Sequence, residues 1–192
     1  MGKMPRAVAG PVRLGAFGVA LILALGPGEP TRAETSQLLA VEDDVARRWP
    51  GILHIAASEF DEAMKEGKVA LFDVREEQEY QVSRIRGAQR VDPGIGREEF
   101  LQRHAGALDG KMAVFYCAVG QRSSRLADRM ARDLRARGAS GVYNLRGGIF
   151  AWHNGAYPLV DGAGPTEYVH PYSQAWGRVI ARQHLLRTTP AR

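Results

Sequence analysis

Short apolar runs alternate with amphipathic stretches along most of the chain. The predicted strands are residues 52–55, 69–74, 87–91, 112–116 and 142–145. Runs that are apolar at nearly every position, such as 69–74, are typical of strands buried on both faces of a sheet. Because helical patterns separate the runs, the chain is predicted to have an α/β fold, a parallel sheet with helices on both faces.

The segments between the strands predict helices at residues 58–66, 76–82, 98–104 and 123–137. In the last of these, Leu126, Met130 and Leu134 recur every four residues and form one apolar face. Gly138 is expected to end that helix, and Ser58 is expected to cap the start of the first one.

The first 33 residues differ from the rest of the chain. Basic residues precede an unbroken apolar stretch at 14–25, Gly and Pro follow at 26–30, and small residues occupy positions 31 and 33. A membrane span needs about 20 apolar residues, so this shorter stretch fits a signal peptide better. We therefore expect a periplasmic or secreted protein. The alternative is an anchor that is not cleaved. The domain would then lie in the same compartment, and this anchor would be the only part of the protein in the membrane.

The rest of the chain divides into three parts. Residues 34–51 are expected to form a lead-in with a helix at 42–49, residues 52–162 the domain, and residues 163–192 a helical C-terminal extension. In that extension Trp176, Val179, Ile180 and Leu186 are expected to form one helical stripe. Such a helix would dock on the domain or, as the alternative, contact a membrane surface or a partner.

Charge gives little support for nucleic-acid binding. The formal net charge is +5, but residues 1–33 carry four basic residues and one acidic residue, so the chain without them carries +2. The five histidines are scattered, without the spacing of a metal site, and we expect neither a metal nor a cofactor.

Cys117 is the single cysteine. Exported proteins commonly use cysteines in disulfide pairs, which one cysteine cannot form within its own chain. One interpretation is an inert buried thiol that packs as a small apolar group. However, Cys117 directly follows the 112–116 strand and opens a loop that contains Gly120 and Arg122. Backbone amides, a helix start and nearby cations at such a position stabilise a thiolate, which favours a reactive nucleophile.

Four motifs resemble those of the rhodanese family, in the same order along the chain. They are Leu71-Phe-Asp-Val-Arg-Glu76 followed by Glu79-Tyr80, Ile85-Arg-Gly-Ala88, Cys117-Ala-Val-Gly-Gln-Arg-Ser123, and Leu145-Arg-Gly-Gly-Ile-Phe-Ala-Trp152. The resemblance spans residues 52–160 and implies a rhodanese-like fold with Cys117 as the catalytic residue. It also implies that the loop binds the sulfur donor, through Ala118, Val119, Gly120, Gln121, Arg122 and Ser123.

Several residues near these motifs are expected to support the domain. Asp73 and Arg75 are interpreted as supports of the loop, and Arg75 and Glu79, four residues apart at a helix start, as a structural ion pair. For Arg122 the alternative to donor binding is a solvated residue at the start of a helix. Ser123 or Ser124 is interpreted as a plain helix cap rather than as a catalytic hydroxyl.

The leading hypothesis is therefore an exported single-domain sulfurtransferase that moves sulfane sulfur through a Cys117 persulfide. Its partners would be a small anionic donor such as thiosulfate and a thiol, cyanide-like or protein acceptor. One alternative is a persulfide carrier or partner-binding module. The other, a cysteine-dependent phosphatase or arsenate reductase, would use a wider loop than the four residues between Cys117 and Arg122.

Overall fold

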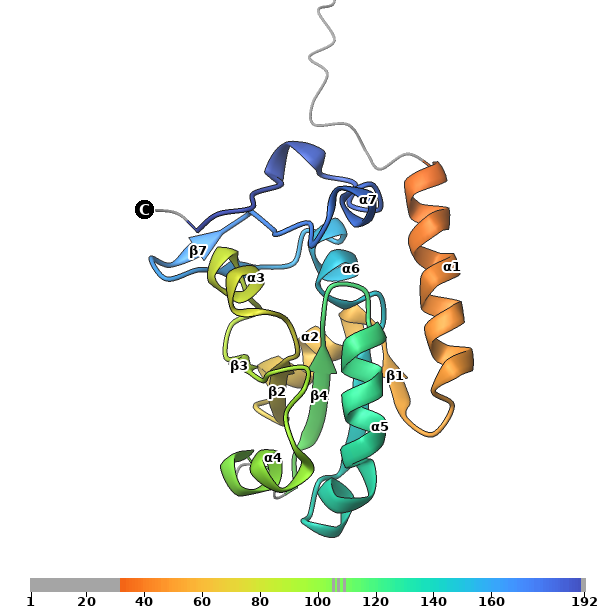
Figure 1. Ribbon diagram of the computed structural model, residues 1–192, viewed down its shortest axis with the longest axis vertical. Helices are drawn as coiled ribbons and strands as arrows, with labels where there is room; N and C mark the ends of the chain where they lie inside the picture. Colours follow the sequence, from red (N-terminus) through yellow and green to blue (C-terminus); the bar gives the residue numbers. More distant parts are fainter. Residues whose placement is uncertain (1–31, 105, 107, 109, 191–192) are drawn as a thin grey trace, which may run out of the picture.

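The computed structural model describes residues 32–104, 106, 108 and 110–190 (Figure 1). It contains a five-stranded parallel sheet in the order β1-β5-β4-β2-β3. The strands are β1 (Leu53–Ile55), β2 (Val69–Asp73), β3 (Gln89–Arg90), β4 (Met112–Tyr116) and β5 (Gly141–Leu145). A short antiparallel pair, β6 (Leu159–Val160) and β7 (Pro165–Thr166), follows. All five predicted strands and the parallel sheet are thus confirmed.

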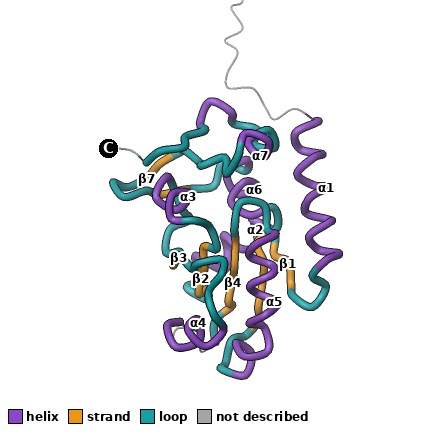
Figure 2. The backbone as a smooth tube through the Cα atoms, viewed as in Figure 1, coloured by secondary structure: helices purple, strands orange, loops and turns teal. Residues whose placement is uncertain are grey.

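Helices cover both faces of this sheet (Figure 2). The helices are α1 (Arg32–Arg48), α2 (Ala57–Lys65), α3 (Glu77–Val82), α4 (Arg97–His104), α5 (Gln121–Ala136), α6 (Gly148–Asn154) and α7 (Gln174–Gly177), with a 3-10 turn at Gln183–Leu185. One apolar cluster joins α4 and α5 to alternate residues of the strands, among them Phe72 and Phe115. The intervening residues, such as Leu71 and Val114, face a second cluster with α1, α2 and α6.

The order of the strands positions the functional end of the molecule. β4 lies between β2 and β5, and Asp73 at the end of β2 is paired in register with Tyr116 at the end of β4. The carboxyl ends of parallel strands meet at one edge, where α/β folds bind their ligands. Cys117 directly follows β4 and therefore lies at this edge.

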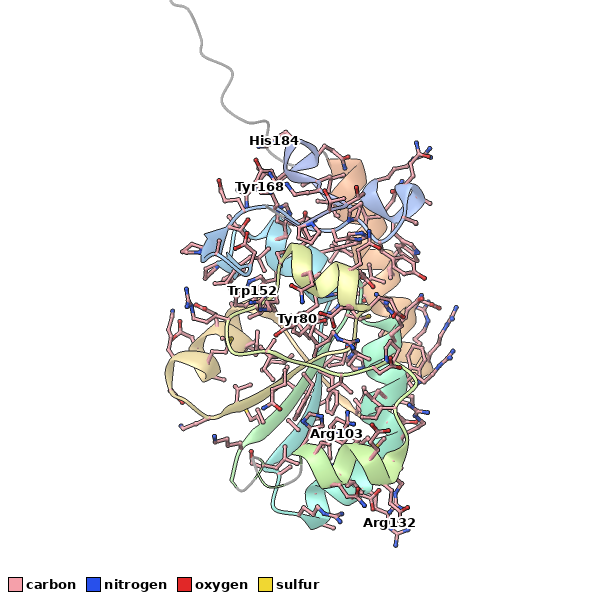
Figure 3. All side chains as sticks on the ribbon, turned by 60° about the vertical axis from the view of Figure 1, so that its left-hand side comes forward. Tyr80, Arg103, Arg132, Trp152, Tyr168 and His184 are labelled. Atoms are coloured by element: carbon pink, nitrogen blue, oxygen red, sulfur yellow. The ribbon has the colours of Figure 1, made fainter. Side chains whose placement is uncertain are left out.

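The C-terminal segment, residues 163–190, packs over the same edge, at the end of the molecule opposite Arg103 and Arg132 (Figure 3). Buried Val169, Val179 and Ile180 join the cluster that contains α6. Asn154 also holds the segment, because its side-chain amide donates to the carbonyl of Val179 at 3.0 Å and accepts the amide of Ala181 at 2.9 Å.

Three expectations from the sequence need correction. The C-terminal segment is not one helix, because helical structure there is limited to α7 and the 3-10 turn; burial of its apolar residues at irregular spacing replaces a helical stripe. The helix expected at 42–49 begins earlier, at Arg32. Helix α2 begins at Ala57, with Ala56 rather than Ser58 at the cap position, and the Glu59 carboxylate accepts the Ala56 amide.

The apolar stretch at 14–25 lies outside the described residues, so the signal-peptide hypothesis stays a prediction. Among the residues that the structure describes, no helix is both long and apolar enough to cross a membrane.

Candidate active site

Cys117 sits at the inner end of a tight loop that joins β4 to α5. Its side chain is 1% exposed, and its Sγ accepts the backbone N–H of Gly120 at 3.2 Å. An N–H group donates more strongly to a negatively charged sulfur than to a neutral one, so this contact suits a sulfur that carries charge during a reaction. The start of a 16-residue helix, α5, adds a partial positive charge at the same place.

Helix α6 fixes the loop from behind. The amides of Ile149 and Phe150 donate to the carbonyls of Cys117 and Ala118 at 2.9 and 3.1 Å. In a trans peptide the N–H and the C=O point in opposite directions. Because the carbonyls of Cys117 and Ala118 point toward α6, the N–H groups of Ala118 and Val119 point away from it. A Cβ on Gly148 would lie 2.3 Å from the Cys117 carbonyl oxygen, so only glycine allows this approach.

Gly120 makes the turn from the loop into α5. Its φ of +98° lies in a region that residues with a Cβ rarely adopt. Next to it, the Ser123 hydroxyl donates to Asn144 Oδ1 at 2.6 Å, and the Asn144 amide group donates to the Leu145 carbonyl at 3.2 Å. Ser123 is fully buried and braces the helix start against β5. The expected serine cap is therefore wrong, because Gly120 is the cap residue of α5 and both Ser123 and Ser124 lie inside the helix.

A cavity of about 120 Å³ opens in front of the loop. Its lining residues are Cys117, Ala118, Val119, Gln121, Arg122, Tyr172 and Trp176. The loop residues named from the sequence are therefore brought together, with two exceptions: Gly120 forms the turn, and the hydroxyl of Ser123 is bonded to Asn144. The last two lining residues come from the C-terminal segment.

Tyr172 is held in an unusual backbone conformation at the mouth of this cavity. Its φ is +62°, which is rare for a residue with a side chain, and its amide donates to His170 Nδ1 at 3.0 Å. Burial lowers the pKa of His170, which keeps that nitrogen available as an acceptor. The centre of the Tyr172 ring lies 4.7 Å from the Arg122 guanidinium carbon, in a cation–π arrangement.

Arg122 forms a two-pronged ion pair. Its two terminal nitrogens donate to the two carboxylate oxygens of Glu79 at 2.7 and 2.8 Å. Burial opposes the charge on both groups, but their mutual hydrogen bonds and charges outweigh it. The pKa of Glu79 is therefore lowered, and the pKa of Arg122 is raised, with a further contribution from the charge of Cys117. Both side chains remain ionised at neutral pH.

Comparison with known proteins fits this geometry. A family model described as "Rhodanese-like domain" matches residues 56–155, which is just over half of the chain. The chain belongs to the rhodanese-like domain family. Two solved structures with similar folds are the thiosulfate sulfurtransferase of Pseudomonas aeruginosa (TM-score 0.48, 21% identity, 78% of this chain and 27% of that chain) and a rhodanese-related protein of Thermoplasma volcanium (TM-score 0.43, 25% identity, 56% of this chain and 97% of that chain).

Curated relatives carry a different name. The tRNA uridine(34) hydroxylase of Staphylococcus haemolyticus is 31% identical over 113 residues, and that of Bacillus velezensis 30% identical over 126 residues. These alignments cover 58% and 65% of this chain but only 34% and 37% of the relatives. The chain thus spans about a third of the length of the relatives that it matches.

Within the rhodanese domain, Asp73 and Arg75 form a fully buried ion pair behind the loop. Arg75 donates to the two Asp73 carboxylate oxygens at 2.8 and 2.6 Å and to the Ser83 carbonyl at 2.7 Å. The expected ion pair between Arg75 and Glu79 is wrong: Arg75 reaches only the Glu79 carbonyl, at 3.4 Å. The Glu79 carboxylate is turned toward Arg122 instead.

Tyr116 connects this ion pair to β4. Its hydroxyl donates to Asp73 at 2.6 Å and accepts the Ile85 amide at 3.2 Å. Burial and the charge of Asp73 hold the pKa of Tyr116 well above its ordinary value, so the hydroxyl keeps its proton. The residue before Cys117 is therefore anchored by a satisfied buried network.

Sequence reasoning missed four residues around the loop: Glu79 as the partner of Arg122, Asn144 as the brace of α5, and the aromatic pair Tyr172 and Trp176. The expected helical stripe did include Trp176, but no local pattern connects that stripe with Cys117. The contact arises from the path of the C-terminal segment over the sheet edge.

Proposed function

We propose that this rhodanese-domain protein is a sulfurtransferase that carries sulfane sulfur as a persulfide on Cys117. The observation that supports this most directly is the 3.2 Å hydrogen bond from the Gly120 amide to Cys117 Sγ, at the start of α5 and on the wall of a cavity. The cavity admits a small donor, while the loop amides favour an anionic sulfur. Small acceptors of the thiol or cyanide type, or a protein thiol, would take the sulfur at the same position.

The proposed reaction has two displacement steps. The Cys117 thiolate attacks the outer sulfur of the donor, an Sγ–S bond forms, and the donor's own bond to that sulfur breaks; with thiosulfate, sulfite leaves with the electron pair. The acceptor then attacks the terminal sulfur, and the electron pair of the Sγ–S bond returns to Cys117. Each step forms one bond to sulfur and breaks one, so no external oxidant or reductant is consumed.

The structure is less suited to a phosphatase or arsenate reductase. Such chemistry needs cationic and amide groups arranged around a tetrahedral oxyanion. Here the single guanidinium that lines the cavity is bonded to a carboxylate, and only four residues separate Cys117 from Arg122. A persulfide carrier or a partner-binding module is the second candidate, since the relatives share this domain as about a third of a longer protein. We also propose, from the apolar stretch at 14–25 and the residues around it, that the protein works in the periplasm or is secreted.

Intact mass spectrometry of the full chain tests the proposal. Treatment with thiosulfate, or with inorganic polysulfide in a second sample, is expected to add the mass of one sulfur atom to the wild type and none to Cys117→Ser. Cyanide is expected to remove the added sulfur as thiocyanate. A Cys117→Ser variant that forms thiocyanate as fast as the wild type would contradict the proposal. A persulfide that no small acceptor discharges would favour the carrier.

A further inference from the structure

The outer wall of the Cys117 cavity comes from outside the matched residues 56–155. Tyr172 and Trp176 belong to the C-terminal segment, yet they supply two of the seven lining residues. Tyr172 is 49% exposed at the mouth of the cavity, and its backbone is held by the bond to His170. An ordered aromatic wall opposite a nucleophile sets which groups can approach it.

The charge inside this cavity is already compensated. Arg122 is the single charged residue among the seven that line it, and Glu79 accepts from both of its terminal nitrogens. The Tyr172 ring covers part of the same guanidinium. A dianionic donor would therefore approach a thiolate without a free cation to offset its charge, which is unfavourable in a partly buried site.

The remaining lining groups are largely apolar. Ala118 and Val119 on the loop face the same space as the rings of Tyr172 and Trp176. An apolar or aromatic substituent on the donor would lose its hydration there and contact these side chains, which is favourable.

From this juxtaposition of a charge-compensated Arg122 with the Tyr172 and Trp176 rings, we propose that the site prefers singly charged sulfane-sulfur donors with an apolar substituent over the dianion thiosulfate. This deepens, and rests on, the proposed sulfurtransferase function. Thiosulfonates (R–SO2–S⁻) and organic hydropersulfides (R–S–S⁻) share this chemistry. Tyr172 and Trp176 are the specificity-determining residues.

The transfer step is balanced for both donors. The Cys117 thiolate bonds to the outer sulfur as the donor's bond to that sulfur breaks. The pair of electrons leaves with a sulfinate, R–SO2⁻, or with a thiolate, R–S⁻. The charge on the departing group equals the charge on the donor, and the persulfide keeps the single negative charge of the former thiolate.

The test compares donors that differ in one property at a time. Thiosulfate and methanethiosulfonate differ mainly in charge, and methanethiosulfonate and benzenethiosulfonate differ in apolar size. Thiocyanate formation with excess cyanide gives kcat/KM for each donor. Benzyl hydropersulfide reacts with cyanide directly. For this donor, mass spectrometry without cyanide therefore measures the rate at which sulfur is added to Cys117.

The variants are Tyr172→Ala and Trp176→Ala, with Tyr168→Ala as the matched control. Tyr168 belongs to the same segment but lies over Arg187 and does not line this cavity. Wild type is expected to use benzenethiosulfonate at least about ten times more efficiently than thiosulfate. Each lining variant is expected to lose about threefold to tenfold with benzenethiosulfonate, from the loss of one aromatic contact. The ratio of benzenethiosulfonate efficiency to thiosulfate efficiency is therefore expected to fall in each lining variant, and the control is expected to match wild type.

Two results would overturn the preference: a wild type that favours thiosulfate, or lining variants that lose efficiency with every donor equally. Thermal unfolding midpoints show whether each variant is folded; if Trp176→Ala is not, the half-exposed Tyr172 decides alone. Failure of the proposed function looks different, because then no donor adds sulfur to Cys117. A persulfide that forms fastest from thiosulfate would overturn this inference and leave the proposed function standing.

Discussion

Replacing Gly120 with alanine tests the loop geometry at its most constrained point. The φ of +98° is unfavourable for any residue with a Cβ, and the new Cβ would lie 2.9 Å from the Asn144 side-chain nitrogen. A strained backbone conformation of this kind costs about 1–3 kcal/mol. For a chain of this size each kcal/mol lowers the melting temperature by about 2–4 °C, so a decrease of several degrees is expected.

The same substitution is expected to slow persulfide formation. Relief of the strain would rotate the Gly120 peptide and weaken its hydrogen bond to Cys117 Sγ, which is 3.2 Å long. A hydrogen bond to a charged group contributes about 1.5–3 kcal/mol, which corresponds to a rate about tenfold to a hundredfold lower. Rapid-quench mass spectrometry, with excess polysulfide as donor, measures the rate of sulfur addition.

Gly67→Ala is the matched control. Gly67 has a φ of +70° and no atom within 4 Å of its would-be Cβ, and it lies in the turn after α2. Alanine there should impose similar backbone strain and lower the melting temperature without changing the rate. If Gly120→Ala adds sulfur as fast as Gly67→Ala, the loop amide does not support the reactive sulfur and the reasoning fails.

Three further predictions concern charges around the site and in the core. Asp73→Asn leaves Arg75 as a buried cation without its anionic partner. The free energy of unfolding, measured by urea titration, is therefore expected to fall by about 3–5 kcal/mol. A loss below about 1 kcal/mol would contradict the importance of this pair. Arg122→Lys cannot make the two-pronged contact with Glu79, so the loop is expected to loosen. We expect the rate of sulfur transfer to fall by about tenfold. An unchanged rate would argue against a role for the two hydrogen bonds of the guanidinium. Burial lowers the pKa of His153 to about 4 in the folded protein, below the 6.5 of an exposed histidine. As the pH falls from 6.5 toward 4, the unfolded chain therefore binds this proton before the folded protein does. The free energy of unfolding is expected to decrease by about 3 kcal/mol over this range. Urea unfolding across this range should show a weaker pH dependence in His153→Gln, whereas equal slopes would contradict the assignment.

Much of the fold follows from short-range pattern. The apolar runs of β2 and β4 are long enough to require burial on both faces, and alternate residues such as Phe72 and Leu71 do face different clusters. The position of Cys117 after β4 then places it at the ligand-binding edge of a parallel sheet. These steps need only the periodicity of the chain and the handedness of its connections.

The site itself was less predictable, because its partners are chosen by packing. Arg75 has four acidic residues within four positions of it in the sequence, and four-residue spacing favoured Glu79. In the structure, Arg75 instead bonds to Asp73 at the end of β2. The Glu79 carboxylate is therefore available to Arg122, which lies 43 residues further along the chain. Likewise, no periodicity in the C-terminal segment indicates that Tyr172 reaches Arg122.

The charges near the loop form two closed pairs, Asp73 with Arg75 and Glu79 with Arg122. Their sum is zero, so ionised Cys117 adds the uncompensated charge to this group. Arg122 attracts that charge in spite of its pairing with Glu79, and the Gly120 amide and the start of α5 add fixed dipoles beside it. Dipoles fixed by the fold stabilise one negative charge without attracting a second one from a distance. For that reason the charge carried by the sulfur donor, and not only its size, should control which donors the cavity accepts.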